Sequence, residues 1–146
     1  LSRELLDSFL DDEIQPEEIL SKCRAMDAGY VYNEITEVKN QQDIEDLNWV
    51  SGGFHDARIA KEKLQNDGTL YGTWGCEIEV WFSGDLEYDT SSRAPEECDP
   101  YWYGSTVILH NGFVYFVDEE DMTVDKITSG YCYFKARHMK YKVIPD

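Results

Sequence analysis

Basic side chains are scarce in this sequence of 146 residues: 13 lysines and arginines stand against 30 aspartates and glutamates, a formal net charge of −17. Proteins bind nucleic-acid backbones and anionic membrane surfaces through clustered lysine and arginine. We therefore expect no nucleic-acid partner and no membrane. An acidic excess keeps a protein soluble through self-repulsion, and it can also steer a basic protein partner towards the surface.

Long hydrophobic runs, paired cysteines and catalytic signatures are also missing. No stretch approaches the ~20 apolar residues of a membrane helix, and no basic-then-apolar signal peptide opens the sequence. The nucleophile elbow, the P-loop and H-E-x-x-H do not occur. The cysteines lack the close C-x-x-C pair typical of zinc sites. We expect no metal, no cofactor and a reducing, cytoplasmic location for the four thiols, which are Cys23, Cys76, Cys98 and Cys132.

Apolar residues are nevertheless plentiful, at 42% of the sequence with 14% aromatics. Disordered acidic tails lack aromatics, so this chain is expected to fold around a hydrophobic core. Its length fits one domain. We predict a single domain over residues 1–146, mainly helical over 1–53 and mainly β over 54–146.

The helical prediction comes from apolar residues at helical spacing. Two amphipathic patterns within residues 2–29 predict helices, and a short helix is expected over 43–50, where Ile44 and Leu47 face inward and Gly52–Gly53 end it. The stretch 30–38 has helical spacing but strand-favouring residue types, so both structures remain open for it.

Beyond residue 53 the apolar period changes to two, which predicts strands separated by turns. The fold class expected is α+β, with the N-terminal helices packed on one face of a mainly antiparallel, meandering β-sheet of about five to seven strands. Residues 85–100 read as a long loop, and the acidic run 118–121 as a solvated turn. The strands are expected over 54–63, 70–82, 106–109, 113–117, 131–137 and 139–144.

Alternation along two of these strands predicts a binding face. Glu77, Glu79 and Trp81 point away from the core on one strand, and Tyr131 and Tyr133 do so on a later one. If both strands lie in one sheet, the five side chains form an aromatic–acidic face of the kind that protein-binding surfaces use. The alternative is that the helices cover this face, which would turn its aromatics into a second core.

The histidines leave a second function open, a small metal-dependent or histidine/carboxylate hydrolase. It would use His55, Asp56 and either His110 or His138. His55 and Asp56 are neighbours on a predicted strand, so their side chains should point to opposite faces unless a bulge intervenes. We therefore expect a non-catalytic protein-binding module in preference to an enzyme.

The sequence W-V-S-G-G-F-H-D-A-R-I over residues 49–59 resembles a group of small bacterial proteins of unknown function. Its motif is Phe54, His55 and Asp56, followed by a small residue and Ile59, with a later strand that ends in an aromatic residue and glycine. Some relatives of this kind are described as immunity proteins of bacterial toxin systems. The resemblance implies an immunity role and carries no catalytic residues, and the acidic balance of the chain agrees with neutralisation of a basic toxin. For His55 and Asp56 we expect a structural role, in which a buried aspartate accepts backbone N–H groups and the histidine bridges strand and helix.

Overall fold

The computed structural model describes residues 34–74, 77–94, 96, 99–128 and 130–144. The chain divides into two units, residues 1–32 and 33–146, and every element described below belongs to the second unit. The helices predicted within residues 2–29 lie outside the described residues. The expected packing of those helices on a sheet face therefore stays a prediction.

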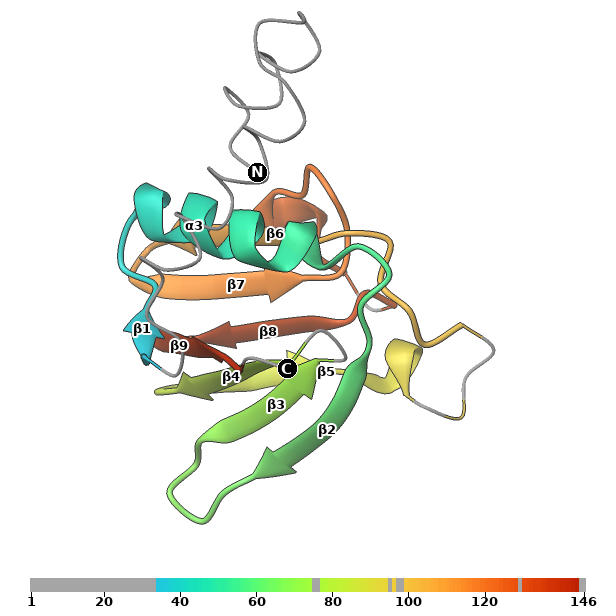
Figure 1. Ribbon diagram of the computed structural model, residues 1–146, viewed down its shortest axis with the longest axis horizontal. Coiled ribbons are helices and arrows are strands. Elements are labelled where there is room, and N and C mark those ends of the chain that lie inside the picture. The colour runs from blue at the N-terminus through green and yellow to red at the C-terminus, as the bar shows by residue number, and fades with distance from the viewer. Residues whose placement is uncertain (1–33, 75–76, 95, 97–98, 129, 145–146) are drawn as a thin grey trace, which may run out of the picture. The chain divides into compact units, whose positions relative to one another are not determined.

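Two antiparallel sheets make up most of the second unit (Figure 1). The strands of the larger sheet are β1 (Thr36–Glu37), β2 (Ile59–Leu64), β3 (Leu70–Trp74), β4 (Ile78–Ser83) and β9 (His138–Val143). The strands of the smaller sheet are β5 (Glu87–Asp89), β6 (Thr106–His110), β7 (Phe113–Val117) and β8 (Tyr133–Ala136). Their orders are β1-β9-β4-β3-β2 and β5-β8-β7-β6. The α+β class is confirmed, with two sheets of five and four strands in place of one meander.

The strand predicted over 70–82 is two strands joined by a tight turn. Trp74 lies opposite Ile78 in the β3–β4 register, and Glu77 leaves the turn with a φ of 63°. Buried and half-buried residues alternate along both strands. Apolar residues alternate with period two both before and after the turn. The apolar pattern alone therefore predicts one continuous strand. Gly72 pairs regularly with Val80 within this ladder.

Helix α3 (Gln41–Ser51) confirms the helix predicted over 43–50 and extends it at both ends. Asn40 begins it with a capping box, in which the Asn40 side chain accepts the Asp43 N–H and the Asp43 carboxylate accepts the Asn40 N–H. Gly52 ends it in the left-handed conformation, with a φ of 63°. Ile44 and Leu47 are buried as expected. In Figure 1, α3 lies over β6 and β7. No helix of the described residues has the length and apolar composition that a membrane crossing requires.

The two sheets pack face to face around aromatic rings. Phe82 of β4 stacks on Phe134 of β8, with ring centroids 4.6 Å apart and planes within 2°. Phe116 of β7 and Trp74 of β3 pack in the same cluster, at 5.7 Å. Because the inner faces meet in this core, the outer faces of the two sheets point away from each other.

Candidate functional site

The predicted aromatic–acidic face does not form, because β4 and β8 belong to different sheets. Trp81 and Glu79 lie on the outer face of the five-stranded sheet, and Tyr133 lies on the outer face of the four-stranded sheet. The stack of Phe82 on Phe134 shows that the opposite faces of these two strands meet in the core. The expectation that all five residues share one face is therefore wrong.

Trp81 already has partners within its own sheet. Its ring lies 5.6 Å from that of Tyr71 on β3, and Lys142 Nζ lies 5.9 Å from its centroid. Lys142 also approaches Glu79, with 3.4 Å between Nζ and Oε2. Trp81 and Glu79 thus belong to a half-buried cross-strand cluster.

Tyr133, Tyr131 and Glu77 lie in three different settings. The Tyr133 hydroxyl donates a hydrogen bond to Glu87 Oε1 at 2.8 Å. Burial, reinforced by this hydrogen bond and the Glu87 charge, raises the pKa of Tyr133 to about 12. Tyr131 is half-buried just before β8, and Glu77 lies in the β3–β4 turn. The structure brings none of these three beside Trp81.

The Phe-His-Asp motif divides between core and solvent. Phe54 is fully buried, with its ring 5.0 Å from that of Phe116. The side chains of His55 and Asp56 are 66% and 82% exposed, with 3.7 Å between Nδ1 and Oδ1. The expectation that Asp56 is buried is wrong. The expectation that the His55 and Asp56 side chains point to opposite faces is also wrong. The reason is local: Phe54 and Asp56 both have a φ of 58°, so the segment turns, and the strand begins only at Ile59.

His110 and His138 line a shared hollow of about 440 Å³ between the β6–β7 turn and the end of β1. His138 Nδ1 lies 2.8 Å from Glu37 Oε1, and this hydrogen bond is the main reason that the pKa of Glu37 lies below its usual value. His55 does not line the hollow, and among the described residues neither a serine, a threonine nor a cysteine does. The described part of the chain also holds no group of three or more ligating side chains placed for a metal ion.

Exposed aromatic rings occur instead on the segment that precedes β6. Tyr101 and Tyr103 are 48% and 61% exposed, while Trp102 between them is fully buried. An extended segment points alternate side chains to opposite sides. Hydrogen bonds from Trp102 N–H to Ala57 O at 2.8 Å and from Asp56 N–H to Trp102 O at 2.9 Å hold this segment against the turn that follows α3.

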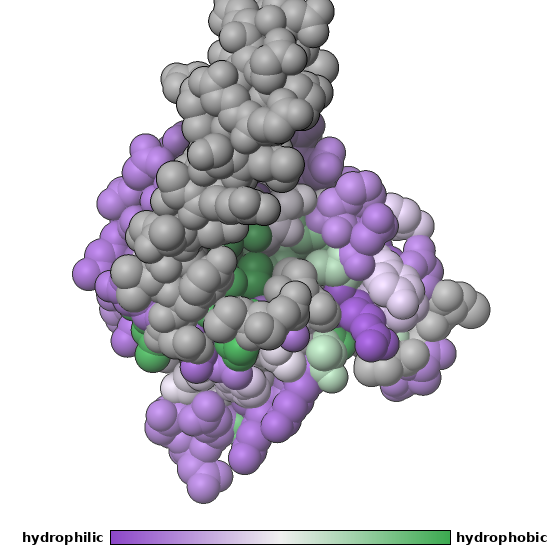
Figure 2. Space-filling view, in the orientation of Figure 1, coloured by the Kyte–Doolittle hydropathy of each residue, from purple (hydrophilic) through white to green (hydrophobic). Residues whose placement is uncertain are grey.

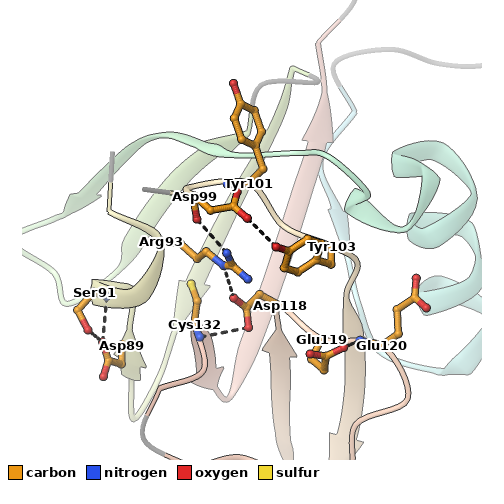
Figure 3. Close-up of polar contacts among 10 residues, drawn as sticks. All are labelled: Asp89, Ser91, Arg93, Asp99, Tyr101, Tyr103, Asp118, Glu119, Glu120 and Cys132. Atoms are coloured by element: carbon orange, nitrogen blue, oxygen red, sulfur yellow. Dashed lines mark hydrogen bonds and ion pairs between the residues drawn. The ribbon is translucent and has the colours of Figure 1, made fainter. Parts of the chain in front are cut away.

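A buried ion pair fixes the base of this segment (Figure 3). Arg93 Nε donates to Asp118 Oδ2 at 2.7 Å, and Arg93 Nη1 donates to the Asp99 carbonyl at 2.9 Å. Asp118 is 4% exposed and accepts the Cys132 N–H, so the prediction of a solvated turn at 118–121 is wrong for this residue. Burial raises the pKa of Asp118, against the opposing effect of Arg93.

The prediction of a long loop over residues 85–100 is also wrong in part, because β5 lies within this range and pairs with β8. The Tyr103 hydroxyl donates to Asp99 Oδ2 at 2.7 Å, and the Arg93 guanidinium lies 5.2 Å from the Tyr103 ring centroid. An exposed ring is thus linked through Asp99 and Arg93 to the buried carboxylate of Asp118.

Carboxylates lie near Tyr101 and Tyr103, and a third exposed aromatic ring lies on α3. The Glu120 side chain packs on Gly104, where an added Cβ would lie 2.5 Å from its Cγ. Trp49, on the solvent side of α3, is 52% exposed. Its neighbour Asn48 lines a hollow together with Ser105 and Glu120. We name this set the acidic–aromatic surface; it comprises Trp49, Asp56, Asp99, Tyr101, Tyr103 and Glu120.

One sign of this surface is visible in the sequence but was not part of the predicted binding face. Tyr101-Trp102-Tyr103 is a short alternation around one large apolar residue, and it lies just before a predicted strand. Trp49 was noted only as part of the resemblance over residues 49–59. No protein-family model, curated protein or solved structure matches this chain.

Proposed function

We propose that this chain is a non-catalytic protein-binding module that holds a basic partner on its acidic–aromatic surface. One observation carries the proposal: Trp49, Tyr101 and Tyr103 are each about half exposed or more, on segments that hydrogen bonds hold together. Exposed tryptophan and tyrosine dominate the binding energy of many protein interfaces. Each ring offers a large apolar area and a polar group in one side chain.

The surface is held in place before any partner arrives. Tyr103 is fixed by Asp99 and by the Arg93 guanidinium, and Arg93 is itself anchored on Asp118. Side chains that are already ordered lose little conformational entropy on binding, so more of the contact energy remains as affinity. This arrangement favours a binding surface over a set of loosely exposed rings.

The charge around the rings favours a basic partner. Asp99 accepts a hydrogen bond from Tyr103, and Glu120 packs on Gly104 next to it. Asp56 lies on the turn that is hydrogen-bonded to Trp102, while Arg93 is engaged by Asp118. The whole chain carries a formal charge of −17, which would accelerate encounter with a cationic protein. An immunity-type role, the neutralisation of a basic toxin, is the form of this function that the resemblance over residues 49–59 suggests.

The experiment is affinity capture of the tagged protein from a lysate of its own source, eluted by a salt gradient and followed by mass spectrometry. The expected result is a stoichiometric basic protein that elutes as salt rises. Binding of that purified partner to Trp49→Ala and Tyr101→Ala should then weaken by about 2 kcal/mol or more, roughly 30-fold.

Leu64→Ala is the matched control, because Leu64 is 57% exposed on β2 and lies outside the acidic–aromatic surface. Its affinity should remain within about twofold of the parent. Equal weakening in all three variants, with unfolding midpoints unchanged, would contradict this surface. Retained affinity in Trp49→Ala and Tyr101→Ala would contradict it as well.

A histidine/carboxylate hydrolase is the second candidate, and its supporting observation is the Glu37–His138 pair in a hollow that His110 also lines. A carboxylate can orient a histidine for general-base catalysis. We place this function second because the hollow offers no serine, threonine or cysteine nucleophile among the described residues. Ester or phosphodiester hydrolysis that disappears in His138→Ala but survives in His55→Ala would establish it.

A further inference from the structure

The outer face of the five-stranded sheet gathers positive charge in an acidic chain. Strand register aligns Lys140, Trp81, Tyr71 and Lys63 in one row across β9, β4, β3 and β2. The adjacent row contains Lys142, Glu79, Thr73 and Lys61. We name this the basic–aromatic face, which comprises Lys61, Lys63, Tyr71, Trp81, Lys140 and Lys142.

Three lysines of the basic–aromatic face form no ion pair, although Glu37 on β1 lies directly opposite one of them, Lys140, in the β1–β9 register. Lys61, Lys63 and Lys140 are exposed and form no ion pair within the part of the chain that the structure describes. Acidic residues outnumber basic ones by 30 to 13 in the sequence, so an exposed lysine has many carboxylates available to it. Other basic side chains form ion pairs with such carboxylates, as Lys135 does with Glu87 and Arg137 does with Asp85. The face therefore holds more positive than negative charge, with four lysines against Glu79 and Glu37.

Protection of the sheet edge accounts for only part of this pattern. Lysines on an edge strand discourage pairing with another chain, and Lys61 and Lys63 lie on β2 at the sheet edge. The β2–β3 hairpin projects from the sheet in Figure 1, and its free end is hydrophilic in Figure 2. Lys140, however, lies on β9 between β1 and β4, where there is no edge to protect.

We propose that the basic–aromatic face binds an acidic, extended segment of a partner protein. Neighbouring strands lie about 4.8 Å apart, so Lys63 and Lys140 at the two ends of the row are about 14 Å apart. This distance matches carboxylates four residues apart on an extended peptide that crosses the strands. The Trp81–Tyr71 pair between these lysines offers an apolar contact for the side chains that intervene. This site is separate from the acidic–aromatic surface and does not depend on the function proposed for it.

Single-stranded nucleic acid fits the same face less well. Its bases need open aromatic planes on which to stack. The planes of Tyr71 and Trp81 are inclined by 41°, and Lys142 lies over the Trp81 ring.

The test is titration of a fluorescently labelled poly-L-glutamate peptide with the full-length protein at low salt, read by anisotropy. The variant Lys63→Gln/Lys140→Gln removes the unpaired lysines at both ends of the Trp81–Tyr71 row. It should bind about tenfold more weakly, as expected for two surface charge contacts. The control Lys126→Gln/Lys135→Gln removes the same charge away from this face and should stay within about twofold of the parent. Trp49→Ala, in the acidic–aromatic surface, should leave peptide binding unchanged.

Three results would overturn the proposal: no saturable binding of the peptide at low salt, equal weakening in both double variants, or tighter binding of a single-stranded oligothymidine than of the peptide. The second would reduce the effect to net charge, and the third would assign the face to nucleic acid. Denaturant unfolding of each variant confirms that differences in affinity are measured on folded protein.

Discussion

Asp118 and Arg93, 25 positions apart, form an ion pair of 2.7 Å in which both side chains are largely buried, at 4% and 15% exposure. The pair joins the end of β7 to the segment that leads to Tyr101 and Tyr103. Asp118→Ala would leave the guanidinium buried without its carboxylate. We expect a loss of about 3 kcal/mol in the free energy of unfolding, measured by denaturant titration.

The control for that variant is Asp85→Ala, which breaks an ion pair with Arg137 at 3.0 Å whose side chains are 70% and 43% exposed. Exposed pairs contribute about 1 kcal/mol or less. Comparable losses in the two variants would show that burial adds nothing to the Arg93–Asp118 pair. The double variant Arg93→Met/Asp118→Leu removes both charges and should be less destabilised than Asp118→Ala.

Gly72 is a second sensitive position, because a Cβ there would lie 2.9 Å from Cζ3 of the buried Trp74 ring. We expect Gly72→Ala to force that ring aside and to destabilise the protein by about 1–3 kcal/mol. The near-ultraviolet circular dichroism should change as well. Thr73→Val, on the other face of the same strand, serves as the comparison; a fold that accepts both changes equally would mean that Trp74 can move freely.

The Tyr133 phenol should ionise well above the ordinary range of tyrosine, because its pKa is raised to about 12. Between the ordinary value of 10.0 and about 12, the folded protein retains this proton while the unfolded chain releases it. The contribution of this phenol to the free energy of unfolding is therefore fully present below that pH window, and it is lost as the pH rises through the window. Ultraviolet titration of tyrosinate should lose a step near pH 12 in Tyr133→Phe, and an unchanged curve would refute the assignment.

Cys132 should be inert to alkylation in the folded state. It is fully buried, and burial raises the pKa of its thiol, which keeps it in the unreactive protonated form. Its backbone N–H is bonded to Asp118, so Asp118→Ala should speed modification by maleimide. Peptide mass spectrometry at Cys132 measures this directly, and rapid labelling of the parent protein under native conditions would count against the burial described.

Elements with strong local signals were predictable from the sequence. Helix α3 follows from the inward spacing of Ile44 and Leu47 and from its glycine stop. The β6–β7 hairpin follows from Asn111 and Gly112, which adopt the positive φ values of 51° and 77° that such a turn requires.

Long-range pairing was not predictable in the same way. β9 pairs with β4 across some 60 residues and also with β1 near the start of the described region. The alternation of apolar residues along a strand is the same whichever sheet the strand joins. The sequence therefore could not show that Trp81 and Tyr133 lie in different sheets, and they were expected on one face. The burial of Asp118 likewise depends on Arg93, which no local pattern connects to it.

The aromatic core described above has an optical consequence. Trp74 and Trp102 meet at 5.9 Å with ring planes at 87°, and both indole N–H groups are buried without a hydrogen-bond partner among the described residues. Such closely coupled chromophores, shielded from water, should emit at short wavelength and give a strong exciton signal. Trp49 is half exposed and should emit further to the red. Trp81 is half-buried beside Tyr71 and adds an intermediate component. In a Trp81→Phe background, the protein's own fluorescence can therefore report occupancy of the acidic–aromatic surface and integrity of the core separately.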